Sequence, residues 1–341
     1  MKRVLFSTIM VLGSYGSLSF LDENVVEKMP STIGNQVDNK GRDLSQPKAV
    51  SKNLYSLEGA TVKTPMTSKS LSQAIDKQIT VLSRKRPFKS NSKFSGLNLT
   101  QEELRIRLIK TAEQLKKWTE EGADEIAFQK QFDLYKVNGF DQRGNIKFTA
   151  YYTPVFEVRT MKDEDFKYPI VKVLPIKDSI TDKRLTEVVW TNNPKTASSI
   201  RMQGSGFIQY SNGQKELLKF VNTYKKKAKL PEDVTIDDNV FFQYFNYPRG
   251  SAGVSLTPQH SIAVDPKLIP YGSCLVSATP VIGRNGKFIR HEYKLLFAQD
   301  TGSMIKGMHV DYYTGVGEEA YLQAKKMSHY GKLWLILAKE E

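Results

Sequence analysis

The chain has 341 residues, 40% of them hydrophobic, which is enough to bury one or two sizeable cores. Its formal net charge of +14 indicates an anionic partner. No zinc-finger spacing or aromatic glycine-rich RNA-binding strand is present, so we predict that this partner is not nucleic acid. A single cysteine, Cys274, excludes an intrachain disulfide, and four scattered histidines give no metal-ligand spacing. We therefore predict neither a metal nor an organic cofactor.

The first 19 residues have the pattern of an export signal. Lys2 and Arg3 precede the apolar run Val4–Leu12, which is too short for a transmembrane helix, and small residues follow it. No lipoprotein cysteine follows the apolar run, so we predict a periplasmic protein without a lipid anchor. An uncleaved signal anchor and an association with the outer membrane stay open as alternatives. Residues 20–67 are polar with little apolar periodicity, which predicts a disordered linker.

Three helices are predicted after the linker. Apolar residues between Leu71 and Leu82 recur at 3.6-residue spacing. Thr100 and Glu103 have the spacing of a capping box, which starts the second helix. Asp124–Phe132 is a third, shorter helical segment. None of them carries an obvious chemical group, so we predict that they form scaffold.

From Phe132 onward the pattern is typical of β-structure, with turns at Ile269–Gly272 and Arg284–Lys287. The predicted strands are Phe132–Asn138, Lys147–Phe156, Tyr168–Leu174, Leu185–Trp190, Ile200–Tyr210, Asn239–Phe245, Ile262–Asp265, Ser273–Ala278, Glu292–Ala298 and Lys332–Ala338. We expect Val316–His329 to be helical. The fold class is therefore predicted as mainly β with N-terminal helices.

The stretch Ala298–Gly317 is the most informative part of the chain. It contains four glycines and two aspartates, Asp300 and Asp311, and predicts a strand, a glycine-rich turn and a second strand. Aspartate is disfavoured inside strands, so Asp311 between Val310 and Tyr312 calls for an explanation. On spacing alone, a purely structural interpretation is as good as a functional one. In the structural interpretation Asp300 caps a turn and Asp311 faces solvent.

Four sequence blocks, spread from about Thr149 to Trp334, carry a family resemblance. The run Asp300–Gly307 followed by Asp311 resembles the three-aspartate (3D) module of the membrane-bound lytic murein transglycosylase A family. The first aspartate of that module corresponds to Asp265. The blocks Thr149–Pro154 and Met202–Gly206 resemble two further motifs of the family.

The resemblance implies a fold that periodicity alone does not give. It implies a double-psi β-barrel built from residues 68–155 and 248–341, together with the N-terminal helices. A smaller β domain, residues 156–247, is inserted, and a groove between the two is expected to hold a glycan. We expect Asn239–Phe245 to begin the second half of the barrel. The chain departs from the family at Ala150, where glycine is usual, and in a shorter segment after Val221.

The resemblance also implies a function. It implies a lytic transglycosylase that cleaves the MurNAc–GlcNAc β-1,4 bond of peptidoglycan and leaves 1,6-anhydroMurNAc ends. Asp311 is expected to act first as general acid and then as general base. Asp300 is the second predicted catalytic residue, either as a tuning charge or as a second carboxylate. Asp265 is expected to support turns through hydrogen bonds to backbone N–H groups.

Seven residues are predicted to contact the glycan. They are Tyr151, Tyr152, Thr153, Gln203, Ser205, Gly302 and Lys306. Tyr151 and Tyr152 project to opposite faces of a regular strand, so only one of them can face a ligand. Without the family context, the favoured explanations are ordinary strand aromatics for the two tyrosines and a β-bulge with no ligand role for the segment with Gln203 and Ser205.

Two other functions stay open. A true hydrolase on the same barrel would use Asp300 as the second carboxylate. A non-catalytic peptidoglycan-binding protein would need no buried acid. In each case the predicted partner is the glycan strand of peptidoglycan, with other cell-wall enzymes as conceivable further partners.

Overall fold

The computed structural model describes residues 55–57, 69–84, 96–138, 144–220, 241–245 and 247–340. The predicted export signal and most of the predicted linker lie outside these residues, as does the shorter segment after Val221. Within the expected linker, β1 (Tyr55–Leu57) pairs antiparallel with β2 (Phe132–Val137), so this part of it is a strand. In the part of the chain that is described, no helix has the length and apolar character needed to cross a membrane.

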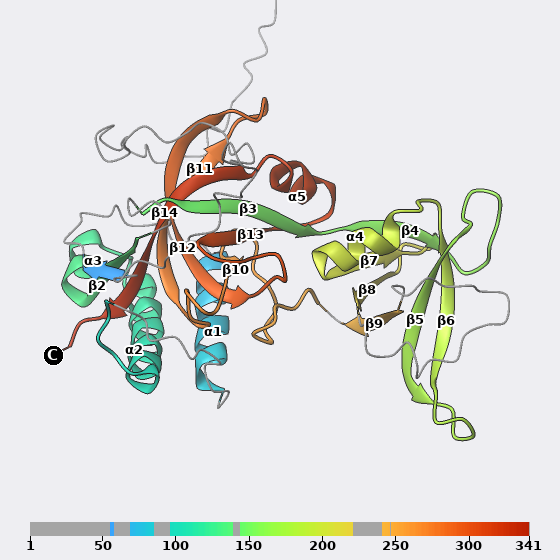
Figure 1. The fold of residues 1–341 in the computed structure, drawn as a ribbon, viewed down its shortest axis with the longest axis horizontal. Helices are drawn as coiled ribbons and strands as arrows, with labels where there is room; N and C mark the ends of the chain where they lie inside the picture. Colours follow the sequence, from blue (N-terminus) through green and yellow to red (C-terminus); the bar gives the residue numbers. More distant parts are fainter. Residues whose placement is uncertain are drawn as a thin grey trace, which may run out of the picture. The chain divides into compact units, whose positions relative to one another are not determined.

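Six strands close a barrel in the order β14–β11–β12–β10–β13–β3, with β3 pairing back to β14 (Figure 1). They are β3 (Ile146–Thr153), β10 (Ser261–Ala263), β11 (Cys274–Ile282), β12 (Phe288–Asp300), β13 (His309–Val316) and β14 (Ser328–Ala338). The pairs β10–β12 and β13–β3 are parallel, and the other pairs around the ring are antiparallel. A mainly β fold with a barrel is thus confirmed.

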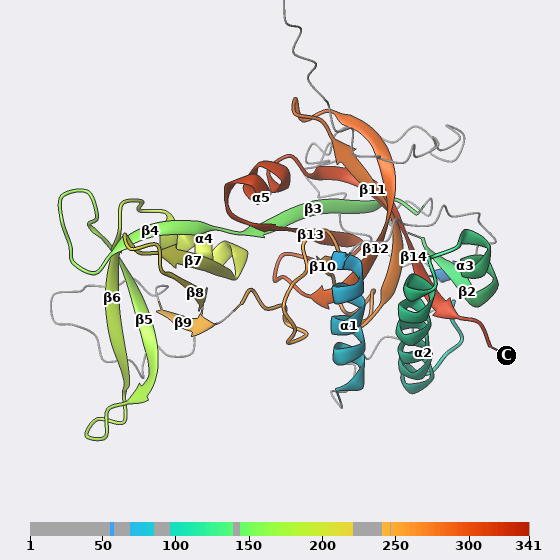
Figure 2. The ribbon, with the colours of Figure 1, turned by 180° about the vertical axis from the view of Figure 1, so that it is seen from behind.

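Three helices come before the barrel strands in the sequence, as predicted. They are α1 (Lys69–Ser83), α2 (Gln101–Glu120) and α3 (Glu125–Gln131), with α1 packed against β12 and α2 against β14 (Figure 2). The capping box is present, because the Glu103 N–H donates to Thr100 Oγ1 at 3.2 Å and the Thr100 N–H donates to Glu103 Oε2 at 2.7 Å. Buried leucines on the inner faces of α1 and α2 join the barrel core.

A second, smaller barrel is inserted between β3 and β10. Its strands close in the order β4–β6–β5–β9–β8–β7. They are β4 (Val155–Arg159), β5 (Tyr168–Lys177), β6 (Arg184–Thr191), β7 (Ser205–Gln209), β8 (Lys215–Phe220) and β9 (Phe241–Phe245). β3 leads into β4 through Pro154, whose missing N–H divides the strand predicted for Lys147–Phe156. β9 pairs with β5 and β8, so the expectation that Asn239–Phe245 begins the second half of the main barrel is wrong.

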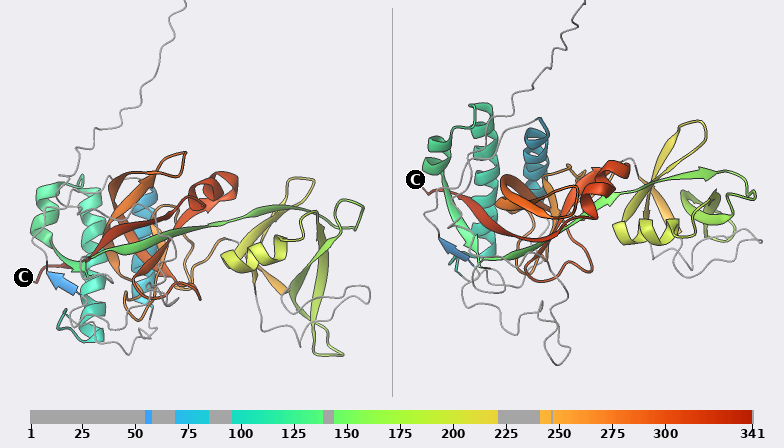
Figure 3. Two further views of the ribbon diagram at one scale, coloured as in Figure 1. Left: turned by 45° about the horizontal axis from the view of Figure 1, so that its top comes forward. Right: turned by 90° about the horizontal axis from the view of Figure 1, so that it is seen from above.

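Two predicted elements differ from the structure. Thr196–Gln203 is helix α4, so the strand predicted from Ile200 begins only at Ser205, after Gly204 ends the helix in a left-handed conformation. The predicted helix Val316–His329 is shortened to α5 (Gly317–Ala324), which follows β13 in the chain and packs against β3 and β13 (red helix in Figure 3). Ser328 and His329 are instead paired with β3. In both cases tertiary packing overrides weak local preferences.

Candidate functional site

Four residues form one row across four neighbouring strands of the main barrel. Ala263 of β10 pairs with Asp300 of β12 on one side and with Asp311 of β13 on the other. Asp311 in turn pairs with Thr149 of β3. Residues directly opposite one another in a sheet project to the same face, so the two carboxylates flank the small Ala263 side chain.

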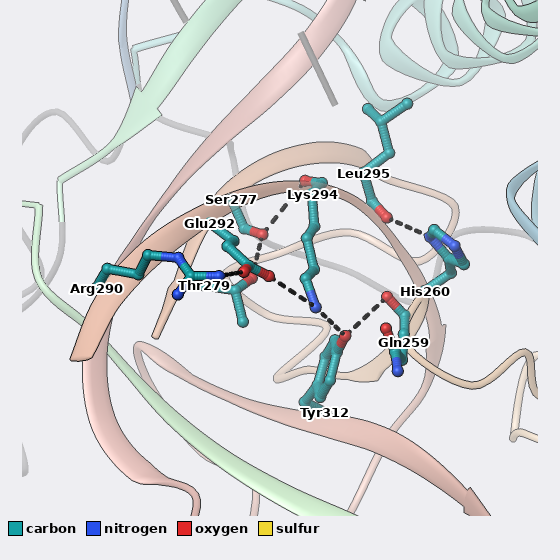
Figure 4. A network of polar contacts seen from close by, with 9 residues as sticks. All are labelled: Gln259, His260, Ser277, Thr279, Arg290, Glu292, Lys294, Leu295 and Tyr312. Atoms are coloured by element: carbon teal, nitrogen blue, oxygen red, sulfur yellow. Dashed lines mark hydrogen bonds and ion pairs between the residues drawn. The ribbon is translucent and has the colours of Figure 1, made fainter. Parts of the chain in front are cut away.

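The next residue of β13 points the other way. Tyr312 is buried in the core, where its hydroxyl donates to the Gln259 carbonyl at 3.0 Å and accepts from Lys294 Nζ at 3.3 Å (Figure 4). Burial lowers the pKa of Lys294, and the neighbouring Glu292 opposes this shift. These contacts hold β13 against β12, so Asp311 is presented on the opposite face of the sheet.

A pocket of about 260 Å³ opens over the row of side chains that includes Asp300 and Asp311. Its lining comes from the main barrel, from the insert and from the segment that joins β9 to β10. The lining residues are Tyr151, Thr153, Arg201, Met202, Gln203, Gly204, Ser205, Lys219, Arg249, Ser251, Leu256, Ala263, Asp300, Thr301, Gly302, Ser303 and Asp311.

Asp311 is an acid with a raised pKa. Burial raises the pKa of its carboxyl group to about 6; the hydrogen bond from Thr149 lowers it, and the charge of Asp300 raises it further. Thr149 Oγ1 donates to Asp311 Oδ1 at 2.6 Å. Among the described residues no donor reaches Asp311 Oδ2, so this oxygen is the one left to carry an acid proton.

A histidine contacts the donor of this hydrogen bond, Thr149. His309 Nε2 lies 2.7 Å from Thr149 Oγ1. Burial, helped by the charge of Lys147, lowers the pKa of His309 to about 4, so the ring is neutral at neutral pH. Because the single hydroxyl hydrogen of Thr149 goes to Asp311, His309 Nε2–H is the donor to Thr149. The three side chains therefore form a directed chain that ends on Asp311 Oδ1.

Asp300 is held by three donors. The N–H groups of Ser251 and Thr301 both donate to Oδ1 at 2.8 Å, and the Tyr151 hydroxyl donates to Oδ2 at 2.9 Å. Burial, followed by the charges of Asp300 and Asp311, holds the pKa of Tyr151 well above its ordinary value. The Tyr151 hydroxyl is therefore a fixed donor, and Asp300 is a fixed negative charge near Asp311.

Asp265 lies outside the pocket lining and joins two loops. Its Oδ1 accepts the Lys267 N–H at 3.1 Å and its Oδ2 accepts the Gly307 N–H at 3.0 Å. The side chain is only 6% exposed. These contacts correspond to the bracing of turns that we predicted for this residue.

Five of the seven predicted glycan-contacting residues line the pocket. Tyr151, Thr153, Gln203, Ser205 and Gly302 line it. The other two predicted residues do not. Tyr152 packs against Tyr321, with 5.3 Å between the two ring centroids. Lys306 is exposed on the loop between β12 and β13.

Comparison with known proteins supports the family assignment. The family model described as "3D domain" matches residues 260–337, which include all three aspartates. Membrane-bound lytic murein transglycosylase A of Escherichia coli K12 is 29% identical over 275 residues, covering 65% of this chain and 74% of that protein. The homologous protein of Buchnera aphidicola is 29% identical over 274 residues, covering 64% of this chain and 74% of that protein.

The chain contains a 3D domain and is a homologue of membrane-bound lytic murein transglycosylase A. Solved structures agree on the fold. The crystal structure of E. coli MltA with bound chitohexaose has a TM-score of 0.63 at 23% identity, covering 92% of this chain and all (100%) of that one. MltA from Neisseria gonorrhoeae has a TM-score of 0.56 at 16% identity, covering 87% of this chain and 96% of that one.

Several residues of the site were not singled out from the sequence. Thr149 opens a recognised motif, but its contact with Asp311 depends on strand pairing across 162 positions. Ser251 and Arg249 lie in Arg249-Gly-Ser-Ala-Gly, whose glycines are the signal that could have identified the loop. Within the described residues, no group of three or more His, Cys, Asp or Glu side chains is arranged to hold a metal ion.

Proposed function

We propose that this protein is a lytic transglycosylase of peptidoglycan, with Asp311 as its general acid and then its general base. The observation that carries the proposal is the buried carboxyl group of Asp311, which lies in a pocket. Its pKa of about 6 lets it hold and release a proton near neutral pH. The names of the curated relatives support the reaction class. Chitohexaose bound to E. coli MltA supports a glycan as the ligand of this pocket.

In the first step, Asp311 Oδ2–H gives its proton to the glycosidic oxygen as the C1–O bond of MurNAc breaks. The leaving sugar departs with a neutral hydroxyl, and Asp311 becomes a carboxylate. Positive charge then develops at C1 and the ring oxygen. The fixed carboxylate of Asp300 lies in the same pocket and favours that charge.

In the second step, the C6 hydroxyl of the same MurNAc attacks C1. Asp311 takes the hydroxyl proton, a new C1–O6 bond forms, and the 1,6-anhydro ring closes. Because the nucleophile belongs to the reacting sugar, its effective concentration is high and no water has to be activated. Asp311 ends the cycle protonated, so one carboxyl group serves both steps.

The hydrolase alternative is less well supported. It needs a second carboxylate free to activate water or to attack the sugar. Both oxygens of Asp300 already accept hydrogen bonds from Ser251, Thr301 and Tyr151. Asp300 therefore fits a positioning and electrostatic role better than that of a base.

The proposal also places the protein in the cell envelope. Its relatives are described as membrane-bound, and peptidoglycan is an envelope polymer. The net charge of +14 agrees with an anionic glycan as partner. The predicted export signal would deliver the chain to the periplasm.

The test is mass spectrometry of peptidoglycan digested with the purified protein. Wild type should release muropeptides with anhydro ends, and Asp311→Asn should release at least ~100-fold fewer, the lower end of a general acid–base contribution. Asp165→Asn, an exposed carboxylate outside the pocket, is the matched control and should behave as wild type. Products heavier by one water, with reducing ends, would identify a hydrolase instead, and a folded, fully active Asp311→Asn would refute the role of Asp311.

A further inference from the structure

The loop between Pro248 and Leu256 brings a cation to the site. Backbone hydrogen bonds close the loop, from Gly250 N–H to the Val254 carbonyl at 3.0 Å and from Leu256 N–H to the Pro248 carbonyl at 2.9 Å. Ser251 of the same loop holds Asp300, as described above. Arg249 lines the pocket, and its loop is anchored to Asp300 through the Ser251 N–H group.

A second arginine meets Arg249 at this loop. Arg84 follows α1, and its Nη1 donates to the Ala252 carbonyl at 2.9 Å. A Cβ atom at Gly253 would collide with Arg84 Nη1 and lie 3.1 Å from Arg249 Nη2. The two guanidinium groups thus converge on one glycine, although they are 165 positions apart in sequence, 249 against 84.

Neither guanidinium is neutralised within the described part of the protein. Arg84 and Arg249 form no ion pair there. Two like charges at short range repel each other, and an anion placed between them removes that repulsion. Guanidinium groups also match the geometry of a carboxylate, which can accept two parallel hydrogen bonds.

The charges inside the pocket are separated by origin. Asp300 and Asp311 come from strands of the main barrel, whereas Arg201 of α4 and Lys219 of β8 come from the insert and Arg249 comes from the loop between Pro248 and Leu256. A neutral sugar chain can accept hydrogen bonds from these cations, but it offers them no opposite charge. A sugar that carries a carboxylate can place its negative charge toward the cations and its glycosidic bond toward Asp311.

We propose that Arg249 and Arg84 form an anionic subsite that binds a carboxylate attached to the muramic acid residue of the substrate. The inference rests on the proposed function, since it names the part of a peptidoglycan strand that the pocket reads. The carboxylate has two possible sources, which are the free lactyl group of a peptide-free sugar and the acidic residues of a stem peptide. Their shared chemistry is that of a carboxylate held by a paired guanidinium site.

Calorimetric binding to the Asp311→Asn protein tests the subsite without turnover. Three hexasaccharides are compared: chitohexaose, a peptide-free glycan of alternating GlcNAc and MurNAc, and the same glycan carrying stem peptides. At least one carboxylate-bearing glycan should bind about tenfold or more tightly than chitohexaose. Preference for the peptide-free glycan identifies the lactyl group, and preference limited to the peptide-bearing glycan identifies the stem. Added salt should lower the affinity for the preferred glycan more than the affinity for the other two.

The Arg249→Gln change should abolish this preference while leaving the affinity for chitohexaose within about twofold, since only a charge-assisted contact is removed. Arg84→Gln should act in the same direction and serves as the second variant, with melting curves to confirm folding. Lys183→Gln removes an equal charge from the exposed β5–β6 hairpin and should change neither affinity.

An unchanged preference in Arg249→Gln, or an equal loss of affinity for all three glycans, overturns the subsite. If none of the glycans binds the Asp311→Asn protein with both arginines intact, the proposed function is refuted as well, whereas equal binding of all three refutes the subsite alone.

Discussion

At the scale of single residues, the site depends on how three neighbours set the proton affinity of Asp311. Burial raises the pKa of the carboxyl group to about 6, the Thr149 hydroxyl lowers it, and Asp300 raises it. His309 completes the chain by donating to Thr149. Thr149 and Asp300 therefore act in opposite directions on the same acid, which makes their effects separable.

We predict that Thr149→Val and Asp300→Asn move the pH–rate profile in opposite directions. General-acid catalysis is lost as Asp311 deprotonates, so its pKa sets the alkaline limb. Thr149→Val removes a hydrogen bond to the carboxylate, so it should raise the pKa of Asp311 and move this limb to higher pH. Asp300→Asn removes a like charge and should lower the limb.

The measurement is the rate of anhydromuropeptide release between acidic and mildly alkaline pH. Ser303→Ala, at an exposed position of the pocket lining, is the control and should leave the limb in place. Shifts of the same sign in Thr149→Val and Asp300→Asn would show that these neighbours do not tune Asp311 in this way.

At the scale of elements, the two loops that enclose the catalytic strands are tied together by Asp265. Its carboxylate links the segment after β10 to the loop between β12 and β13, through the Lys267 and Gly307 N–H groups. The sequence placed Asp265 in the three-aspartate motif beside two pocket residues. In the structure its buried carboxylate instead accepts hydrogen bonds from the backbone N–H groups of Lys267 and Gly307.

We predict that Asp265→Asn loses stability rather than chemistry. An amide oxygen can replace only one carboxylate oxygen, so one of the two part-buried N–H donors loses its acceptor, at a cost of about 1 kcal/mol. The midpoint of thermal unfolding should fall by several degrees, while activity measured well below that midpoint stays close to wild type. A rate loss as large as that of Asp311→Asn, in a protein with unchanged melting, would instead place Asp265 in the reaction.

At the scale of the whole molecule, burial of an acid for function costs stability. The carboxyl group of Asp311 has a pKa of about 6 in the folded protein against 3.8 as its ordinary value. Because the folded-state pKa is the higher one, the folded state loses stability relative to the unfolded state as pH rises from 3.8 to 6. Above that window the whole cost is present, and below it there is none.

We therefore predict that Asp311→Asn is more stable than wild type above pH 6, with a gain of roughly 1–3 kcal/mol in the free energy of unfolding. The gain should shrink through the window and vanish near pH 4. Thermal or urea unfolding of both proteins at several pH values measures it, with Asp165→Asn as the control that shows no such trend. A stability difference that does not change with pH would contradict the raised pKa of Asp311.

What the sequence determined by itself was mostly local. The capping box of α2 needs only Thr100 and Glu103 at a spacing that one helical turn brings together. The strand, turn and strand around Asp300 and Asp311 follow from a short run of β-type residues interrupted by glycines. Such features are readable because their partners lie within a few positions of one another.

Only the tertiary structure decided which distant residues meet. The parallel pairing of β13 with β3 sets Thr149 against Asp311, and Ala263 separates the two carboxylates because β10 lies between β12 and β13. The convergence of Arg84 and Arg249 on Gly253 has no trace in hydrophobic periodicity. The physical reason is that strand register and loop packing are settled by burial and hydrogen bonding over the whole barrel. Local spacing can therefore identify an acid in a strand, but not the neighbours that give it a pKa suited to its chemistry.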